Sequence, residues 1–322
     1  MLIEIILNVM INKKICIIVP VYNEQFNIKK IVSEIEKTIK KIKYKFDILF
    51  VDDGSNDNTF KILNNLSLKK KNVKVLKFNK NYGKESALAA GMNFASNYEA
   101  AITLDSDLQH PPILITKLFK EWKKGHPMVL FIRKENKGSS KIRHLFSIMF
   151  YKFINFFLNF ENLKFSTDFR IYDKKIITEF NNTPVMNGLF RVRIDSLGFD
   201  YKILEFSAPK RLHGDSNYSL YKLIKIAVFS IFDFSMKPLK IIVIFSSVFF
   251  LASSFFLFFL LVDYFFLNYL SILPRTIIAS FNLFITSINF LVLGTVCIYL
   301  NSIKNLISVK KIYNIERKLN ID

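Results

Sequence analysis

The sequence predicts a mostly parallel α/β domain followed by two helices that are long enough to cross a membrane. Strand-like and helix-like segments alternate from Lys14 to Ile132, which is typical of a sheet with helices on both faces. Residues 241–262 and 277–300 are two long runs without a charged side chain. The first run would extend about 33 Å as a helix, against a hydrocarbon core of about 30 Å. A buried helix of a soluble protein is also apolar, but two such runs close together favour membrane spans.

The alternating segments follow from two local patterns. Short continuous apolar runs predict buried strands, and apolar residues three or four positions apart predict amphipathic helices. The segment 84–97 is rich in alanine, which favours a helix. In chain order, the expected elements are strand 15–19, helix 27–43, strand 46–51, helix 58–68, strand 73–78, helix 84–97, strand 100–104 and strand 128–132.

Two further amphipathic segments precede the apolar runs. Polar residues fall four apart between Arg143 and Phe160, on a segment that is otherwise apolar and rich in phenylalanine. Residues 219–236 carry Lys222 and Lys225 on one side. A helix with a wide apolar face suits the membrane interface. The pattern of the first segment also fits a helix of a protein core that exposes one polar stripe. We expect both segments to be interfacial helices.

Lysine and arginine are distributed unevenly around the apolar runs. Lys237 and Lys240 precede the first run and the basic segment 301–322 follows the second, whereas residues 263–276 contain Arg275 as their single basic residue. This asymmetry predicts a short external loop and both termini in the cytoplasm. The formal net charge of +20 suits an anionic bilayer, and because no nucleic-acid-binding motif accompanies it we expect no nucleic acid partner.

Polar and acidic residues collect where three of the predicted strands end. Residues 20–24 follow the first strand, residues 52–55 the second and residues 105–109 the fourth. Ligands of parallel α/β sheets bind outside the carboxyl ends of the strands, so we expect a site at this edge. The sequence has neither a G-x-G-x-x-G segment after its first strand nor a Walker-type loop, which argues against a dinucleotide oxidoreductase and a P-loop nucleotidase.

Residues 105–112, DSDLQHPP, place two aspartates one residue apart at a strand end. Two such carboxylates can share one hard cation, and oxygen ligands suit Mg²⁺ or Mn²⁺. The cation in turn can hold a diphosphate. Taken alone, the pattern also fits an Asp-rich turn before a helix whose first turn contains Pro112. The other two strand-end segments favour the ligand site.

The ordered motifs resemble those of family 2 inverting glycosyltransferases of the GT-A fold. The segments that carry the resemblance are IVPVYNE (18–24), VDDGS (51–55) and DSDLQHPP (105–112). Within the family, the chain resembles the polyprenyl-phosphate glycosyltransferases, which include dolichol-phosphate mannose synthase and the bactoprenol glucosyltransferases. Further elements of those enzymes match NYGKE (81–85), DFRIY (168–172) and RLHGDSNY (211–218).

The resemblance implies inverting transfer of a hexose from a nucleoside-diphosphate sugar to the phosphate of a polyprenyl phosphate, at the cytoplasmic face of the membrane. UDP-glucose is favoured as the donor because the segment 81–85 is of the bactoprenol type, and GDP-mannose is the alternative. A Mg²⁺ or Mn²⁺ cofactor and a homo-oligomer are also implied. A processive polysaccharide synthase is disfavoured, because the sole tryptophan, Trp122, lies outside any Gln-x-x-Arg-Trp element. An inactive membrane scaffold is also disfavoured, because it would have no need of Asp53, Asp105, Asp107 and Gln109 together.

The resemblance also assigns roles to individual residues. Nucleotide-sugar binding is implied for Pro20, Tyr22, Glu24, Val51, Asp53, Asp105, Ser106 and Arg133. A catalytic role is implied for Asp105, Asp107, Asp168 and Arg211. Metal binding is implied for Asp107 with Gln109, and binding of the acceptor or its phosphate for Lys84, Arg211 and Ser216.

Several of these residues have a structural alternative. Asp52 can cap the following helix, Arg133 can be a surface charge and Lys84 can simply open its helix. Asp168 can act as a base, orient the acceptor, hold metal or pair with Arg170. A phosphate acceptor is largely ionised near neutral pH, so it needs little help from a base.

The expected organisation of the chain has seven parts. They are an N-terminal extension (1–13), the GT-A domain (14–216) with an interfacial helix near 142–160, an interfacial amphipathic helix (217–240), a first span (241–262), an external loop (263–276), a second span (277–300) and a basic cytoplasmic tail (301–322).

Overall fold

The computed structural model describes seven stretches of the chain, which fall into two compact units. The described residues are 14–133, 156, 166–183, 190–206, 235–267, 273–306 and 313–321. One unit comprises residues 1–233 together with 309–322, and the other comprises residues 234–308. The extension 1–13 and nearly all of the two expected interfacial helices lie outside the described residues.

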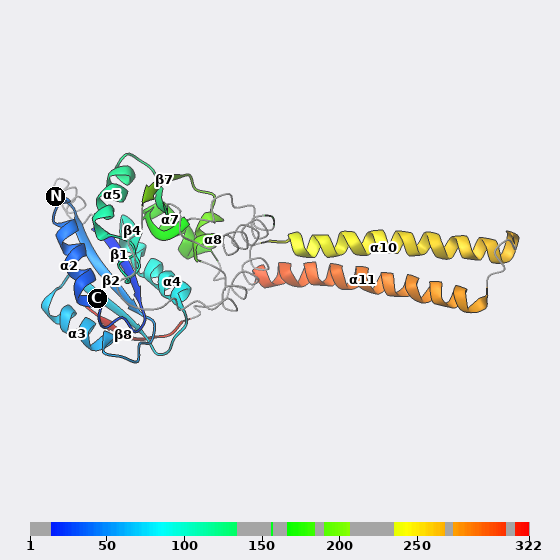
Figure 1. Ribbon diagram of the computed structural model, residues 1–322, viewed down its shortest axis with the longest axis horizontal. Coiled ribbons are helices and arrows are strands. Elements are labelled where there is room, and N and C mark those ends of the chain that lie inside the picture. Colours follow the sequence, from blue (N-terminus) through cyan, green and yellow to red (C-terminus); the bar gives the residue numbers. More distant parts are fainter. Residues whose placement is uncertain are drawn as a thin grey trace, which may run out of the picture. The chain divides into compact units, whose positions relative to one another are not determined.

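Eight strands among the described residues form one sheet, in the order β7-β5-β6-β4-β1-β2-β3-β8 (Figure 1). The pairs of β1 with β2, β1 with β4, β2 with β3 and β5 with β7 are parallel, while β6 runs antiparallel to both its neighbours. The predicted mostly parallel α/β fold is therefore confirmed. The strands are β1 (Lys14–Val21), β2 (Lys45–Asp52), β3 (Val73–Phe78), β4 (Ala100–Thr103), β5 (Met128–Arg133), β6 (Ser166–Asp173), β7 (Tyr201–Phe206) and β8 (Ile315–Leu319).

Helices cover both faces of the sheet, and strand β1 shows why. Ile15, Ile17 and Val19 pack in one apolar cluster with residues of α2 and α5. Cys16 and Ile18 point to the opposite face and pack with residues of α4 and α7. A strand buried on both faces must be apolar at every position, which explains the continuous run in the sequence. The helices of this unit are α2 (Ile28–Ile39), α3 (Thr59–Lys69), α4 (Lys84–Phe94), α5 (Ile115–Lys123), α7 (Lys174–Asn182) and α8 (Phe190–Asp195).

The boundaries differ from the prediction mainly at helix ends. Helix α2 stops at Ile39, four residues before the expected end, and α4 passes into a 3₁₀ turn at Ala95–Asn97. A second 3₁₀ turn, Pro112–Leu114, precedes α5. No strand is predicted after Ile132, whereas the structure adds β6, β7 and the C-terminal strand β8.

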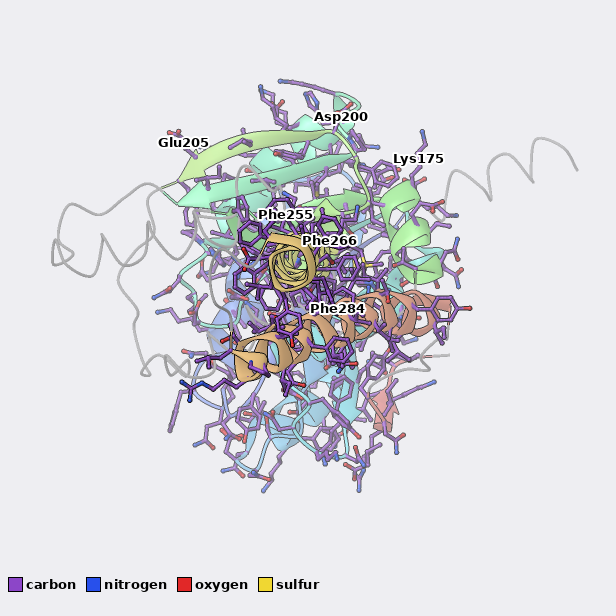
Figure 2. All side chains as sticks on the ribbon, turned by 90° about the vertical axis from the view of Figure 1, so that its right-hand side faces the viewer. Lys175, Asp200, Glu205, Phe255, Phe266 and Phe284 are labelled. Carbon is purple, nitrogen blue, oxygen red and sulfur yellow. The ribbon has the colours of Figure 1, made fainter. Side chains whose placement is uncertain are left out.

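The second unit is a hairpin of two long helices, α10 (Lys237–Val262) and α11 (Pro274–Leu306), which run side by side in opposite directions (Figure 1). A π-helical segment, Asp263–Leu267, continues α10 into the expected external loop. Both helices are long and apolar enough to cross a membrane, and 11% of the most apolar window of each is buried. That low fraction argues against two core helices of a soluble protein. Seen nearly end-on in Figure 2, α10 projects apolar side chains around its circumference, among them Phe255, which is 73% exposed.

Small residues line the contact between the two helices. Ser246, Ser253, Ser280 and Ser287 are buried, and the hydroxyl groups of Ser253 and Ser287 lie 2.9 Å apart. Gly294 lies so close to α10 that an added Cβ would be 3.0 Å from Val243 Cγ2. Within each helix these residues recur every seven positions, which keeps them on one face of a gently supercoiled pair. The small side chains therefore allow the helix backbones to approach closely.

We predict that Gly91→Ala destabilises the unit that contains the sheet even though alanine is the better helix former. A methyl group at Gly91 would overlap Ile18 Cγ2, so α4 packs on β1 only without it. Overpacking costs about 1–3 kcal/mol, whereas the gain in helix propensity is about 1 kcal/mol. Chemical or thermal unfolding of the single variants and of Ile18→Ala/Gly91→Ala measures this. The double variant should lose less stability than the sum of its parts, and strict additivity would contradict the contact.

Candidate active site at the carboxyl edge of the sheet

Three strands bring candidate residues to one level of the sheet. Ile18 of β1 pairs with Thr103 of β4, and Thr103 pairs with Arg170 of β6. Two residues further along each register, Pro20 lies near the end of β1, Asp105 lies just past the end of β4 and Asp168 lies within β6. The order of the parallel strands reverses between β1 and β4, which is where doubly wound sheets bind ligands. Val21 of β1 also pairs with Asp52 of β2, so the three segments expected after the first, second and fourth strands begin at the same edge of the sheet.

Lys84 connects the two carboxylates of this edge. It is the first residue of α4, and its Nζ lies 2.6 Å from Asp105 Oδ1 and 2.8 Å from Asp168 Oδ2. Arg191 of α8 approaches the other oxygen of Asp168, with Nε 3.7 Å away. Asp168 is almost fully buried, whereas Lys84, Asp105 and Arg191 are each about one quarter exposed. These four charges come from four separate elements, and they alternate in sign.

This arrangement keeps Asp168 and Lys84 ionised. Burial opposes the charge on Asp168, but the nearby Lys84 and Arg191 outweigh it and hold the pKa of this carboxyl well below its usual range. Burial also opposes the charge on Lys84, yet Asp105 and Asp168 raise the pKa of this ammonium well above its ordinary value. An aspartate with so low a pKa is a weak proton acceptor near neutral pH.

Asp105, Asp107 and Gln109 lie on the open side of the turn after β4. These three residues are half-buried, whereas the alternate residues Ser106, Leu108 and His110 are buried. Asp107 Oδ1 accepts the backbone N–H of Gln109 at 3.0 Å, and Leu108 has a φ of +58°, so the turn is tightly formed. The alternation therefore presents oxygen-bearing side chains together at the end of the strand.

The buried side chain of His110 anchors the same turn in the apolar core. Its ring stacks on Phe169 with centroids 5.4 Å apart and packs against Phe206 at 5.5 Å. Nδ1 lies 3.5 Å from Asp105 Oδ2 but makes no hydrogen bond of good geometry. Burial lowers the pKa of His110, so the ring is neutral near pH 7. The side chain holds the backbone of the turn in place beside Asp105.

The two carboxylates at the end of β2, Asp52 and Asp53, bind different backbone groups. Asp53 accepts the backbone N–H groups of Tyr82 at 2.7 Å and Gly83 at 2.8 Å, and each of its oxygens has a second lone pair. Asp52 is fully buried, and its Oδ1 accepts the backbone N–H of Ser55 at 2.9 Å. Asp52 therefore fixes the turn 52–55, whereas the N-terminus of α3 lies six residues later at Asn58 and has no side-chain cap.

The remaining predicted residues fall into three groups. Pro20 and Val51 are buried in the sheet, while Tyr22 and Glu24 are half-buried in the loop after β1. Arg133 ends β5, and its side chain lies outside what the structure describes. Arg211 and Ser216 both lie in the segment 207–234, outside the described residues.

Comparisons with known proteins identify the family. The family model described as glycosyl transferase family 2 matches residues 16–180, about half of the chain. The chain belongs to this family. It is 33% identical over 225 residues to the glycosyltransferase YkcC of Bacillus subtilis (strain 168), covering 70% of this chain and 69% of the relative. It is 31% identical over 228 residues to the prophage bactoprenol glucosyl transferase homolog of Escherichia coli (strain K12), covering 71% and 74%.

A likeness to solved structures adds the fold of the catalytic unit. Glucosyl-3-phosphoglycerate synthase of Mycobacterium tuberculosis, in complex with Mn²⁺, UDP-glucose and phosphoglyceric acid, matches with a TM-score of 0.50 and 15% identity. The match covers 70% of this chain and 79% of that chain. The family 2 domain of this chain therefore has the GT-A fold.

Two further residues, Glu85 and Arg191, lie beside the candidate site and were not predicted from the sequence. Glu85, adjacent to Lys84, accepts the backbone N–H of Phe190 and so holds the start of α8. Arg191 follows directly and reaches Asp168. The nearest local signal is a basic pair, Arg191 and Arg193, that alternates with apolar residues. Such a pattern also occurs on solvated surfaces, so only the packing of α8 against α4 reveals the role of Arg191.

Glu85 yields a prediction about stability and pH. Burial, reinforced by the charge of Asp168, raises the pKa of Glu85 to about 7. A carboxyl whose pKa is raised by folding contributes stability below its unfolded pKa, and this is lost as the pH rises through the folded value near 7. Glu85→Gln removes the charge and retains an oxygen for the N–H of Phe190.

We therefore expect Glu85→Gln to be more stable than the parent at pH 8, by about 1–2 kcal/mol in the free energy of unfolding, and so to unfold at a higher temperature. Near pH 4.5 the two proteins should have the same stability. Thermal unfolding of the full chain in detergent at several pH values measures this. Glu34→Gln on the exposed side of α2 serves as the control and should show no such gain. A uniform loss of stability at both pH values would show that Glu85 acts as an ionised carboxylate.

Proposed function

We propose that this family 2 glycosyltransferase transfers a hexose, with inversion, from a nucleoside-diphosphate sugar to the phosphate of a polyprenyl phosphate, and that the donor is UDP-glucose. One observation carries the proposal: the charged edge built by Lys84, Asp105 and Asp168 belongs to a chain that also contains two largely exposed apolar helices. A soluble sugar acceptor would leave those helices unexplained. Relatives at 30–31% identity named as bactoprenol glucosyl transferases or homologues support the lipid acceptor.

The order of the elements supports a membrane hairpin with the site on the cytoplasmic side. Strand β3 precedes the two apolar helices and β8 follows them, yet the two strands pair in one sheet. The chain must therefore cross the bilayer an even number of times between them. Basic residues before α10 and after α11, set against Arg275 alone in the loop, orient both ends toward the cytoplasm.

The donor lies along the ends of β1, β2 and β4 in this proposal. Pro20, Tyr22, Glu24, Val51 and Asp53 line the base and ribose, with the ring of Tyr22 for stacking and the carboxylates accepting from N–H and hydroxyl groups. Asp105, Ser106 and Arg133 lie toward the sugar and the diphosphate. The tight contacts between the two strand-end loops, such as that of Asn23 N with Ser55 Oγ at 2.9 Å, preform this surface.

The residues after β4 fit a divalent cation. In the part of the chain that the structure describes, no three His, Cys, Asp or Glu side chains are placed to hold a metal by themselves. Mg²⁺ is commonly held by one or two carboxylates with substrate phosphates as the other ligands. Asp107 and Gln109 supply the protein oxygens for such an ion, while Asp105 is already neutralised by Lys84. When bound, the cation stabilises negative charge on the departing diphosphate.

The acceptor needs positive charge more than it needs a base. A phosphate monoester with a second pKa near 6 is largely dianionic near pH 7 and can attack the anomeric carbon directly. Lys84 and Arg191 offer that charge, and Asp168 fixes the direction of both. The weak basicity of Asp168 favours this orienting role over that of a general base. Arg211 and Ser216 remain further candidates for the phosphate, by the resemblance given above.

Transfer to a short-chain polyprenyl phosphate tests the proposal. The full chain in detergent should transfer glucose from UDP-glucose in the presence of Mn²⁺ or Mg²⁺, and faster than it transfers mannose from GDP-mannose. Asp107→Ala should lose transfer at all practical metal concentrations, while its unfolding temperature stays close to that of the parent. Near-normal turnover of Asp107→Ala would remove the residue from the metal site. Failure of the parent chain with both donors would contradict the proposed reaction.

The role of Asp168 is tested separately with Asp168→Asn. We expect a loss of about 10- to 100-fold in kcat/KM, mostly through the KM for the lipid phosphate, because Lys84 and Arg191 lose their anchor. In the plot of kcat/KM against pH, the fall in rate on the acid side should still be centred near pH 6, where the acceptor phosphate itself loses its second proton. Steady-state kinetics from pH 5 to pH 9 measure both effects. A loss of 10³-fold or more in kcat at unchanged KM would instead make Asp168 the base.

A further inference from the structure

The segment that follows the second apolar helix is built into the edge of the catalytic sheet. Strand β8 pairs antiparallel with β3, from Val75 opposite Leu319 to Phe78 opposite Ile315. The side-chain amide of Asn320 lies within hydrogen-bonding distance of three backbone carbonyl groups in and beside the α3–β3 connection, at 2.7, 2.8 and 3.2 Å. The segment is thus anchored at its far end by specific bonds.

At the near end, an aromatic contact leads from this segment to a loop of the candidate site. The ring of Tyr313 stacks on Phe78 with centroids 5.0 Å apart and an interplanar angle of 18°. Phe78 in turn meets the ring of Tyr82 edge-on, with centroids 5.6 Å apart. The backbone N–H of Asn79 also donates to the carbonyl oxygen of Asn314 at 3.3 Å. Tyr313 is buried, although it is 231 positions later in the chain than Tyr82.

The other side of this loop holds Asp53. The backbone N–H groups of Tyr82 and Gly83 donate to the two oxygens of Asp53. The backbone of Lys80 packs so closely on Gly54 that an added Cβ there would lie 2.5 Å from Lys80 C. The loop 79–83 therefore lies between Asn314 and Phe78, on which Tyr313 stacks, on one side and the turn at Asp53 and Gly54 on the other.

We propose that Tyr313 is a positioning residue for the nucleotide end of the donor site, acting through the loop 79–83 on Asp53. The proposal rests on the function proposed above, in which Asp53 contacts the base or ribose. In this backbone position the loop presents two N–H groups to Asp53, and Tyr313 supports the position through Phe78, whose ring contacts that of Tyr82. Because Tyr313 follows α11, the segment downstream of the apolar hairpin completes the donor site.

Nucleotide binding measured by calorimetry tests this role. With Mn²⁺ present, Tyr313→Ala in the full chain should raise the Kd for UDP by about 5- to 10-fold, the loss expected for removing an aromatic contact of this kind. The KM for the nucleotide sugar should rise by a similar factor, while kcat stays within about twofold. Tyr313→Phe keeps the stack and should bind like the parent. Tyr313→Leu fills the space without stacking and provides a second variant if the alanine variant does not fold.

Two controls separate positioning from general loss of stability. Arg317→Ala alters an exposed residue of β8 and should leave the Kd unchanged. Ile35→Ala, on the opposite face of the sheet, should lower the unfolding temperature without weakening UDP binding. Unchanged affinity of Tyr313→Ala or Tyr313→Leu, or an equal loss of affinity in Ile35→Ala, would overturn the positioning role. If the parent chain binds neither UDP nor GDP, the donor assignment itself fails and this role fails with it.

Discussion

Two carboxylates from different strands approach one ammonium group at the carboxyl edge of the sheet, and the geometry of the site depends on that contact. Without Lys84, the negative charges of Asp105 and Asp168 would face one another in a partly buried setting, where like charges repel by several kcal/mol. Because Lys84 opens α4, the same contact fixes the N-terminus of that helix against β4 and β6. Glu85, the next residue, then holds α8 and sets the position of Arg191. The contacts that balance the charges of the site are therefore the same contacts that hold α4 and α8 in place.

The two units of the chain suit different surroundings, the catalytic unit water and the helical hairpin lipid. The catalytic unit buries its apolar residues in two clusters on either side of a sheet, and the charged residues of the candidate site lie at the carboxyl edge of that sheet. The helical hairpin does the reverse, with small polar residues inside and phenylalanine outside. The hairpin's pattern suits a hydrocarbon surround, since only there are outward-facing phenylalanines stable and inward-facing serines useful for close packing. The return of the chain as β8 joins the end of the hairpin to the catalytic sheet.

Substantial parts of the fold could be predicted because their signals are local. Strands β1, β2 and β4 are short, largely apolar runs since they are buried on both faces, and the acidic residues at or after their ends mark the edge of the sheet. Residues 241–262 and 277–300 can be recognised as long apolar helices because each run is long and lacks charged side chains. Asp105, Lys84 and Asp168 were all singled out from motifs, yet no motif indicated that one ammonium joins the two carboxylates.

What the sequence alone determined, then, is the class of the fold, the acidic edge and the two apolar helices, because each arises from residues that are close together in the chain. Only the tertiary structure decided the pairing of β6 with β4, which brings Asp168 beside Asp105, and the placing of Arg191 and Tyr313. Strand β8, with the sequence IERKL, has three charged residues out of five and carries no apolar signal. Contacts between residues that are far apart in the chain depend on register and packing across the whole sheet, and no local pattern encodes them.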